Sequence, residues 1–302
     1  MSTRRSDLAD LTYFLAIARH RNFRLAGIEM GVSASALSHA LKGLEARLGV
    51  RLLHRTNRSV TLTEAGAALR DAVTDPFARI DQAIDDLNRH RDTPTGRIRL
   101  NVLADAASLL LAPVLPVFAD RYPGIQVDIA ARDRMVDVID GGFDAGIRHG
   151  DTVPEDMVAQ RLSADLRWMV VAAPAYIERH GVPAHPEALR DHHCLGVRLG
   201  DDRIYRWEFE GSQGEFAVAV PSRIIVDDGR AMLALALAGV GLMYAMEHNV
   251  APHVAAGTLV PVLSDWATTG PGYHIYYSSR RQVPTGLRLL IDLIRERRPL
   301  GL

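Results

Sequence analysis

Hydrophobic residues in the first fifty positions recur at the spacing of short helices. In the first helix the repeating positions are Leu8, Leu11, Phe14, Leu15 and Ala18, which predict an end near Arg19. A second helix is expected from about Phe23 to Met30, followed by a tight turn at Gly31 and Val32. Ser33 is the expected N-cap of a third helix, whose apolar face carries Leu37, Leu41, Leu44 and Leu48. Two helices joined by so short a turn predict a helix-turn-helix.

A short hairpin is predicted directly after these helices. Residues 50–55 and 60–62 are expected to form two short strands, and residues 56–59 between them are a polar, basic tip. A hairpin in this position is the wing of a winged helix-turn-helix. Residues 1–62 are therefore expected to form one all-α domain with a small wing.

One long helix is predicted over residues 63–92, with Thr63 as its cap. Its apolar positions recur at steps of three and four residues: Ala65, Leu69, Val73, Phe77, Ile80, Ile84 and Leu87. A narrow apolar stripe between charges is typical of a coiled-coil seam, although it also suits a helix packed on its own domain. Pro76 predicts a bend. The turn formers at residues 92–96 mark the end of this linker helix.

From Gly96 onward strands and helices alternate. Strands are expected at residues 98–102, 125–131, 145–148, 168–173, 195–199, 224–226, 241–244 and 273–278. Helices are expected at residues 109–122, 135–140, 230–238 and 285–297. This alternation predicts parallel sheets with helices on both faces. The length of residues 93–302 suits two α/β lobes, about 96–163 with 267–302 and about 164–266.

Composition places the chain among ordinary globular proteins, with 302 residues, 48% hydrophobic and 24% charged. The net charge of −1 conceals an asymmetry. Residues 1–62 hold ten Arg and Lys against four Asp and Glu, a net of +6, so the remainder carries −7. A basic block beside an acidic remainder predicts that the block meets a polyanion such as nucleic acid. The lone Cys194, early charges at Arg4 and Arg5 and the lack of a long apolar run predict a cytoplasmic protein without a membrane span.

Candidate DNA contacts lie on the outer face of the third helix and in the wing. Short or hydrogen-bonding side chains on that face are able to enter a major groove and reach base edges: Ser33, Ala34, Ser35, Ser38, His39 and Lys42. Basic and polar residues placed to meet phosphates or a narrow minor groove are Arg24, Arg55, Asn57 and Arg58. Taken singly, each would also suit a solvated helix or loop. The basic charge balance and the turn spacing together favour DNA binding.

The N-terminal region resembles the DNA-binding region of the LysR-type transcriptional regulators. The resemblance rests on residues 23–50, which read FRLAGIEMGVSASALSHALKGLEARLGV, and continues through residues 53–56 and 62–66. It departs at Gly27, where the family usually has alanine. An interior helical glycine costs about 1 kcal/mol relative to alanine.

The rest of the chain resembles the effector-binding domain of the same family. The matching phrases are PVFADRYP at 116–123, GFDAGIR at 142–148, AAPAY at 172–176, AGVGL at 238–242, GTLVPVL at 257–263 and YYSSRR at 276–281. The resemblance implies a two-lobed α/β domain like type 2 periplasmic binding proteins, with a small-molecule effector between the lobes. It also implies self-association through the linker helix as a dimer or tetramer, duplex operator DNA as the main partner, and RNA polymerase as a further one.

Candidate effector contacts follow the carboxyl ends of the predicted strands, where helix N-termini offer free N–H groups. In the first lobe they are Asp105, Ala106, Ala107, Ser108, Arg132, Asp133, Arg134, Arg148 and His149. In the second lobe they are Arg198, Leu199, Gly200, Asp227 and Asp228. Asp105 aligns where many relatives carry a serine or threonine that binds an effector carboxylate. An acid there repels a carboxylate, so the ligand is expected either not to be a simple acid at that end or to offer a hydroxyl or amine, unless Asp105 is only a helix N-cap.

Other chemistry has little support in the sequence. Adjacent side chains at His192, His193 and Cys194 point in divergent directions and lack a zinc-like spacing, so no metal is expected. No cofactor motif or catalytic triad is recognisable, and an enzyme or exported solute-binding protein is disfavoured by the basic block and the missing export signal. An alternative is a DNA-binding regulator without a small-molecule ligand, which responds to oxidation of Cys194 or to no signal at all.

Overall fold

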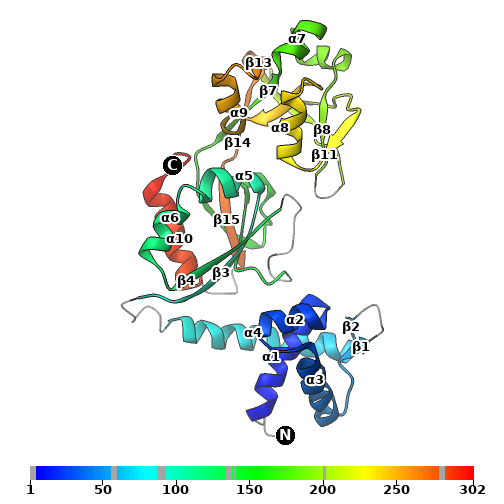
Figure 1. Cartoon of the computed structure of the whole chain (residues 1–302), viewed down its shortest axis with the longest axis vertical. Coiled ribbons are helices and arrows are strands. Elements are labelled where there is room, and N and C mark those ends of the chain that lie inside the picture. Colours follow the sequence, from blue (N-terminus) through cyan, green and yellow to red (C-terminus); the bar gives the residue numbers. More distant parts are fainter. Residues whose placement is uncertain are drawn as a thin grey trace. The chain divides into compact units, whose positions relative to one another are not determined.

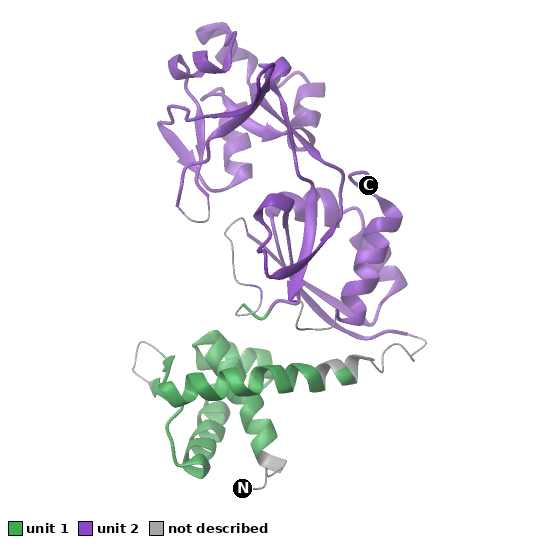
Figure 2. Ribbon diagram, turned by 180° about the vertical axis from the view of Figure 1, so that it is seen from behind, with its two compact units in different colours: residues 1–92, 140–142 green, residues 93–139, 143–302 purple. Residues whose placement is uncertain are grey.

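The computed structural model describes residues 5–55, 60–86, 93–132, 138, 141–199, 202–278 and 283–302. The chain divides into two compact units, which Figure 2 colours separately. The first comprises residues 1–92 and 140–142, and the second comprises residues 93–139 and 143–302.

Three helices form the body of the first unit (Figure 1): α1 (Arg5–His20), α2 (Phe23–Met30) and α3 (Ala34–Leu48). Asn22 caps α2 by accepting hydrogen bonds from the backbone N–H groups of Arg24 and Leu25. Gly31 follows α2 with a φ of 66°, a left-handed conformation that glycine adopts without strain. Ser33 caps α3 by accepting a hydrogen bond from the N–H of Ala36, as predicted.

The core of this unit explains why the helices cross. Phe14, Ile17, Leu37, Leu41 and Leu44 are each 0% exposed and belong to one apolar cluster. The predicted apolar faces are therefore confirmed in the middle of the helices. They are wrong at two ends, where Leu8 and Leu48 are 47% and 41% exposed because these ends extend past the core.

A small antiparallel hairpin follows, with β1 (Leu53–Arg55) paired to β2 (Val60–Leu62). The tip of the predicted wing, residues 56–59, lies outside the described residues. The linker helix α4 (Glu64–Asp86) begins immediately afterwards, and Thr63 caps it by accepting the N–H of Gly66. Pro76 lies inside this helix. The predicted continuation over residues 87–92 is outside the described part of the chain.

A five-stranded sheet organises the first lobe of the second unit, in the order β4-β3-β5-β15-β6. Its strands are β3 (Gly96–Val102), β4 (Ile125–Ala131), β5 (Ala145–His149), β6 (Met157–Arg161) and β15 (Tyr273–Ser278). The helices α6 (Leu115–Arg121) and α10 (Thr285–Arg297) bury their apolar residues against it (Figure 1). The described residues thus place the carboxyl ends of the parallel strands β3, β4 and β5 at one edge of the sheet.

The second lobe is built on β7 (Leu166–Ala172), which pairs antiparallel with β12 (Met243–Met246), β13 (Val260–Val262) and β14 (Thr268–Gly270). A parallel pair joins β8 (Leu195–Val197) to β11 (Ile224–Val226), and a hairpin joins β9 (Trp207–Gly211) to β10 (Gly214–Val218). Its helices are α7 (Pro174–His180), α8 (Gly229–Leu237) and α9 (Glu247–Ala255).

The prediction of parallel sheets is wrong for part of the fold. β15 runs antiparallel to both β5 and β6, and every partner of β7 is antiparallel. The chain leaves the first lobe through β6 and returns to it through β15, so these two strands run in opposite directions.

The predicted helix at 109–122 is also interrupted. A helical turn α5 (Ala104–Ala106) and a π-helical turn at Ala107–Leu111 precede α6. Pro113 lacks the N–H that a continuous helix requires. Of the predicted helix at 135–140, only residue 138 is described.

Candidate DNA-binding interface and effector domain

The outer face of α3 presents short polar side chains. Ala34, Ser35, His39 and Lys42 are exposed, and Ser38 is half-buried. Ser33 is exposed as well, but its hydroxyl is engaged as the cap and lies 2.9 Å from the Ser35 hydroxyl. The buried leucines occupy the opposite face, so the helix is anchored on one side and open on the other. This is the placement that direct contact with base edges requires.

The carboxylates of the first 62 residues are all engaged within the unit. Asp7 and Asp10 accept hydrogen bonds from Arg47, whose pKa they raise. Glu29 pairs with Arg19 at 2.7 Å and with His20. The fourth carboxylate, Glu45, accepts two backbone N–H groups.

Several cations of the unit are left for an external partner. Within the described residues, Arg24, Lys42 and Arg51 have no acidic partner within 4 Å. Four acidic side chains cannot neutralise ten basic ones, and these three cations carry part of the +6 net charge that is available to a polyanion. Arg55 ends β1, while Asn57 and Arg58 lie outside the described residues.

The structure gives a steric reason for a glycine at position 27. A Cβ added there would lie 2.6 Å from the backbone oxygen of Val32, in the turn that joins α2 to α3. The departure from alanine, expected from sequence only as a cost to the helix, thus matches a close approach of that turn to α2.

In the effector domain, the first-lobe candidates gather at the carboxyl edge of the five-stranded sheet. Asp105, half-buried on α5, does not occupy the N-cap position, which belongs to Leu103. Its carboxylate instead accepts the N–H of Ala106 at 2.7 Å. Ala106 is buried, Ala107 is half-buried, and the Ser108 hydroxyl donates to the Ala104 carbonyl. Asp133 and Arg134 lie outside the described residues.

Arg148 is buried and hydrogen-bonded within the first lobe. Its side chain is 2% exposed and donates to the side-chain oxygen of Asn101 and to the carbonyls of Ile147 and Arg132, the last two at 3.1 Å. Arg132, by contrast, is exposed. Of these two arginines, the geometry makes Arg132 available to a ligand and ties Arg148 to the sheet.

The second-lobe candidates lie at the ends of β8 and β11. Arg198 is exposed and donates to the Asp202 carbonyl at 3.3 Å, and Leu199 is half-buried. Asp227 is exposed, whereas Asp228 caps α8 by accepting the N–H of Ala231 at 2.8 Å. Gly200 is outside the described residues.

A group of aromatic rings in contact with one another lies beside His149 at the end of β5. No pattern in the sequence predicted this group. The His149 ring stacks on Tyr273 at 4.9 Å and meets the edge of Trp168 at 5.6 Å. Trp168 in turn stacks on Tyr244 of the second lobe. His149 Nδ1 and Trp207 Nε1 are buried and have no hydrogen-bond partner within the described residues. No spacing in the sequence could have shown this, because the rings come from strands on two sheets.

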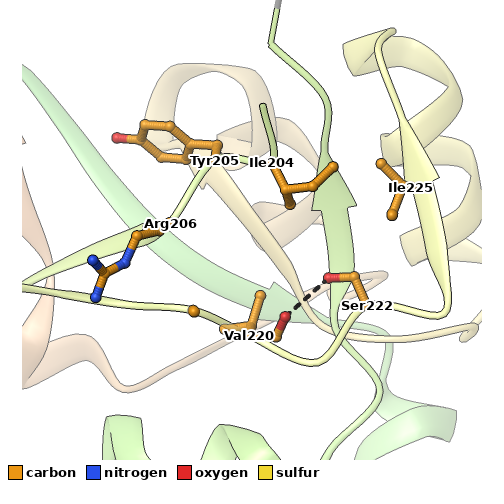
Figure 3. A pocket seen from close by; sticks show the side chains of 7 residues that line it. Ile204, Tyr205, Arg206, Val220, Ser222 and Ile225 are labelled. Carbon is orange, nitrogen blue, oxygen red and sulfur yellow. Dashed lines mark hydrogen bonds between the residues drawn. The ribbon is translucent and has the colours of Figure 1, made fainter. Parts of the chain in front are cut away.

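A pocket of about 230 Å³ lies in the second lobe (Figure 3). Its lining is mostly apolar and comes from Ile204, Tyr205, Arg206, Ala219, Val220, Ser222 and Ile225. In Figure 3, Ile204, Val220 and Ile225 face the pocket, and the Ser222 hydroxyl bonds to the Val220 carbonyl. None of the predicted effector residues lines it.

The described residues contain neither a cluster of metal-ligating side chains nor a membrane-spanning helix. No group of three or more His, Cys, Asp or Glu side chains there is arranged to hold a metal ion. No helix in the described part of the chain has the length and apolar character needed to cross a membrane.

The Cys194 thiol is 3% exposed, and burial raises its pKa to about 12. Because the thiolate is the reactive form, we expect Cys194 in the folded protein to react with iodoacetamide at neutral pH far more slowly than in the urea-unfolded chain. Mass spectrometry of the two samples measures the rates. Equal labelling would restore oxidation of Cys194 as a regulatory signal.

The anchored outward-facing helix, the adjoining hairpin and the exposed cations define a winged helix-turn-helix DNA-binding protein with a two-lobed α/β domain. Residues 8–67 match the bacterial regulatory helix-turn-helix proteins of the lysR family, and residues 91–299 match the LysR substrate binding domain. The chain belongs to the LysR family of transcriptional regulators. It is a DNA-binding transcriptional regulator with an effector-binding domain.

Relatives and solved structures resemble the chain over nearly its whole length. The uncharacterized HTH-type transcriptional regulator YcaN of Escherichia coli K12 is 38% identical, covering 96% of this chain and 95% of that protein. The regulator PgrR of the same strain is 31% identical, covering 97% and 98%. CrgA, a LysR-type regulator from Neisseria meningitidis, superposes with a TM-score of 0.60 at 27% identity, covering 98% and 99%. The Vibrio cholerae virulence activator AphB, at 22% identity and a TM-score of 0.64 over 96% and 98%, shares the fold.

Proposed function

We propose that this regulator binds a partly palindromic operator as a homodimer or tetramer, with α3 in the major groove and the wing on the backbone. The observation that carries the proposal is the outer face of α3, which is short, polar and exposed. Nearby cations have no acidic partner within 4 Å among the described residues. Base contacts are assigned to Ser35, Ser38, His39 and Lys42. Phosphate contacts are assigned to Arg24, Arg55 and Arg58.

Self-association through α4 is part of the proposal. Ile80 on this helix is 50% exposed, an apolar position without a covering partner of its own unit. Two copies joined along such a seam would present two recognition helices to one duplex. The regulator is expected to act in the cytoplasm together with RNA polymerase.

The effector is proposed to bind at the carboxyl edge of the first-lobe sheet and the facing strand ends of the second lobe. Asp105, Arg132 and His149 support this placement in the first lobe, and Arg198 and Asp227 in the second. The unpartnered His149 Nδ1 is a buried polar atom that a ligand or water molecule would satisfy. Asp105 favours a ligand that donates a hydrogen bond.

Selection of bound duplexes from a random pool with the full-length chain tests the DNA-binding proposal. We expect enrichment of one partly palindromic sequence whose half-sites are separated by about one helical turn or a multiple of it. Ser35→Ala should relax selectivity within each half-site, while Arg24→Ala should weaken binding to all sequences alike. A pool that stays random at physiological salt would contradict the proposal.

A further inference from the structure

Glu45 on α3 reaches the backbone at the base of the wing. It lies on the last turn of the recognition helix and is half-buried. Its Oε1 atom accepts the N–H of Leu52 at 2.8 Å and the N–H of Leu53 at 3.2 Å. Leu53 is the first residue of β1, so a single carboxylate joins the recognition helix to the strand that leads into the wing.

The same backbone is held from the opposite side by the start of the linker helix. The N–H of Thr63 donates to the Leu52 carbonyl at 3.0 Å, and the Thr63 hydroxyl donates to the Arg51 carbonyl at 2.7 Å. Gly66 approaches so closely that an added Cβ would lie 2.0 Å from the Leu52 oxygen. Residues 51–53 therefore form a junction between α3, the wing and α4.

The described strands of the wing are short, and Val60 and Leu62 of β2 pack against the apolar cluster of the unit. The two strands pair over three residues each, from Leu53–Leu62 to Arg55–Val60. An isolated two-stranded hairpin is marginally stable in water, so contacts of its strands with the rest of the unit are needed to hold it in place. Leu52 and Leu53 supply apolar anchoring, at 1% and 4% exposure, and Glu45 supplies the polar link to α3.

A carboxylate near this interface carries an electrostatic cost. The unit is basic and is assigned to a polyanion, so a negative charge on its recognition helix weakens binding through repulsion. Removing only the charge should therefore strengthen binding, whereas removing the hydrogen bonds should weaken it. This opposition of signs separates the two roles of Glu45.

We propose that Glu45 is a positioning residue that sets the wing relative to the recognition helix, so that the wing cations reach phosphates while α3 occupies the major groove. The inference rests on the proposed DNA-binding function and goes beyond it by assigning a role to a residue that does not contact DNA. Its direct targets are the N–H groups of Leu52 and Leu53, and its indirect targets are Arg55 and Arg58.

Three variants of the full-length chain test this role by fluorescence anisotropy on the selected duplex across a range of salt concentrations. Glu45→Gln keeps an acceptor oxygen of the same reach without the charge, and we expect wild-type or tighter binding with the wild-type salt slope. Glu45→Ala removes the acceptor, and we expect at least tenfold weaker binding at low salt. Its salt slope should fall by about 0.9 for each phosphate that the wing no longer reaches. Glu45→Asp keeps the charge but is one methylene shorter, so it should lose the same hydrogen bonds and show the same fall in salt slope as Glu45→Ala, with binding at least as weak.

A double-mutant comparison identifies the wing as the target. Arg55→Ala combined with Arg58→Ala should reduce the salt slope of the wild type and of Glu45→Gln but add little in Glu45→Ala or Glu45→Asp. Amide exchange at Leu52 and Leu53 should accelerate in the same two variants. If Glu45→Ala does not fold, Glu45→Asp carries the comparison.

The outcomes separate this inference from the function on which it rests. A wild-type chain that selects no duplex overturns the DNA-binding proposal and this inference with it. Selective wild-type binding combined with an unchanged salt slope in folded Glu45→Ala and Glu45→Asp overturns the inference alone. So does a Glu45→Gln variant that loses as much affinity as Glu45→Ala.

Discussion

Gly66→Ala is expected to destabilise the DNA-binding unit by about 2 to 3 kcal/mol, a typical cost of overpacking. The new Cβ would lie 2.0 Å from the Leu52 oxygen and 2.9 Å from its carbonyl carbon. Both atoms belong to the backbone, so α4 would have to shift and break the hydrogen bond from Thr63. The gain of about 1 kcal/mol from replacing a helical glycine does not offset this clash.

Thermal unfolding followed by circular dichroism measures the loss, and peptide-level amide exchange assigns it to residues 5–86. Tryptophan fluorescence gives an internal control, because Trp168, Trp207 and Trp266 all lie in the second unit and should report an unchanged transition. Gly43→Ala on α3 is the matched variant. Its Cβ would meet only the end of the Arg47 side chain, at 3.2 Å, so we expect no loss of stability. Equal stability of the two variants would contradict the close packing of α4 on Leu52.

Arg148→Ala is expected to destabilise the effector unit by about 3 kcal/mol. The buried guanidinium donates to the side chain of Asn101, itself 0% exposed, and to two carbonyls. Truncation leaves these acceptors without their donor and opens a cavity in the five-stranded sheet. The loss should appear as an earlier tryptophan fluorescence transition on heating, while exchange of peptides from α1 to α3 stays unchanged.

Arg132→Ala is the control for this substitution. The Arg132 side chain is exposed, and only its backbone carbonyl meets Arg148, so we expect a stability change within about 0.5 kcal/mol. If Arg148→Ala unfolded like the wild type but abolished effector response, Arg148 would be a ligand-binding residue, as the sequence alone indicated. The pair of variants therefore distinguishes a structural arginine from one that meets the effector.

Local signals in the sequence identified the elements of the DNA-binding unit well. The leucine spacing, the turn at Gly31 and the cap at Ser33 act within a few residues, so they predicted the bounds of α2 and the start of α3. Local patterns of apolar residues also predicted β4 and α10 over their observed residues. The alternation rule failed where the chain crosses between lobes, because strand direction at β15 depends on the return path and not on local pattern.

The candidate site residues also divide into those whose placement follows from local geometry and those whose contacts depend on the tertiary fold. The exposed face of α3 follows from helical geometry once the buried leucines are known. The exposure of Ser35, His39 and Lys42 was therefore predictable. The hydrogen bonds of Arg148 and Glu45 were not predictable. Arg148 follows a strand end like the other predicted effector residues, and only its contacts with Asn101 and Arg132 show that it belongs to the sheet.

The sequence by itself determined the order of domains, the helix-turn-helix, the placement of positive charge and membership of the family, because each is encoded in short-range spacing or in composition. Only the tertiary structure decided which charged side chains are paired and which remain exposed. The four carboxylates of the basic block find their partners through folding, and the aromatic rings around His149 meet across two sheets. The contacts of Asp7 with Arg47 and of His149 with Tyr273 join positions far apart in the chain, and no local pattern specifies them.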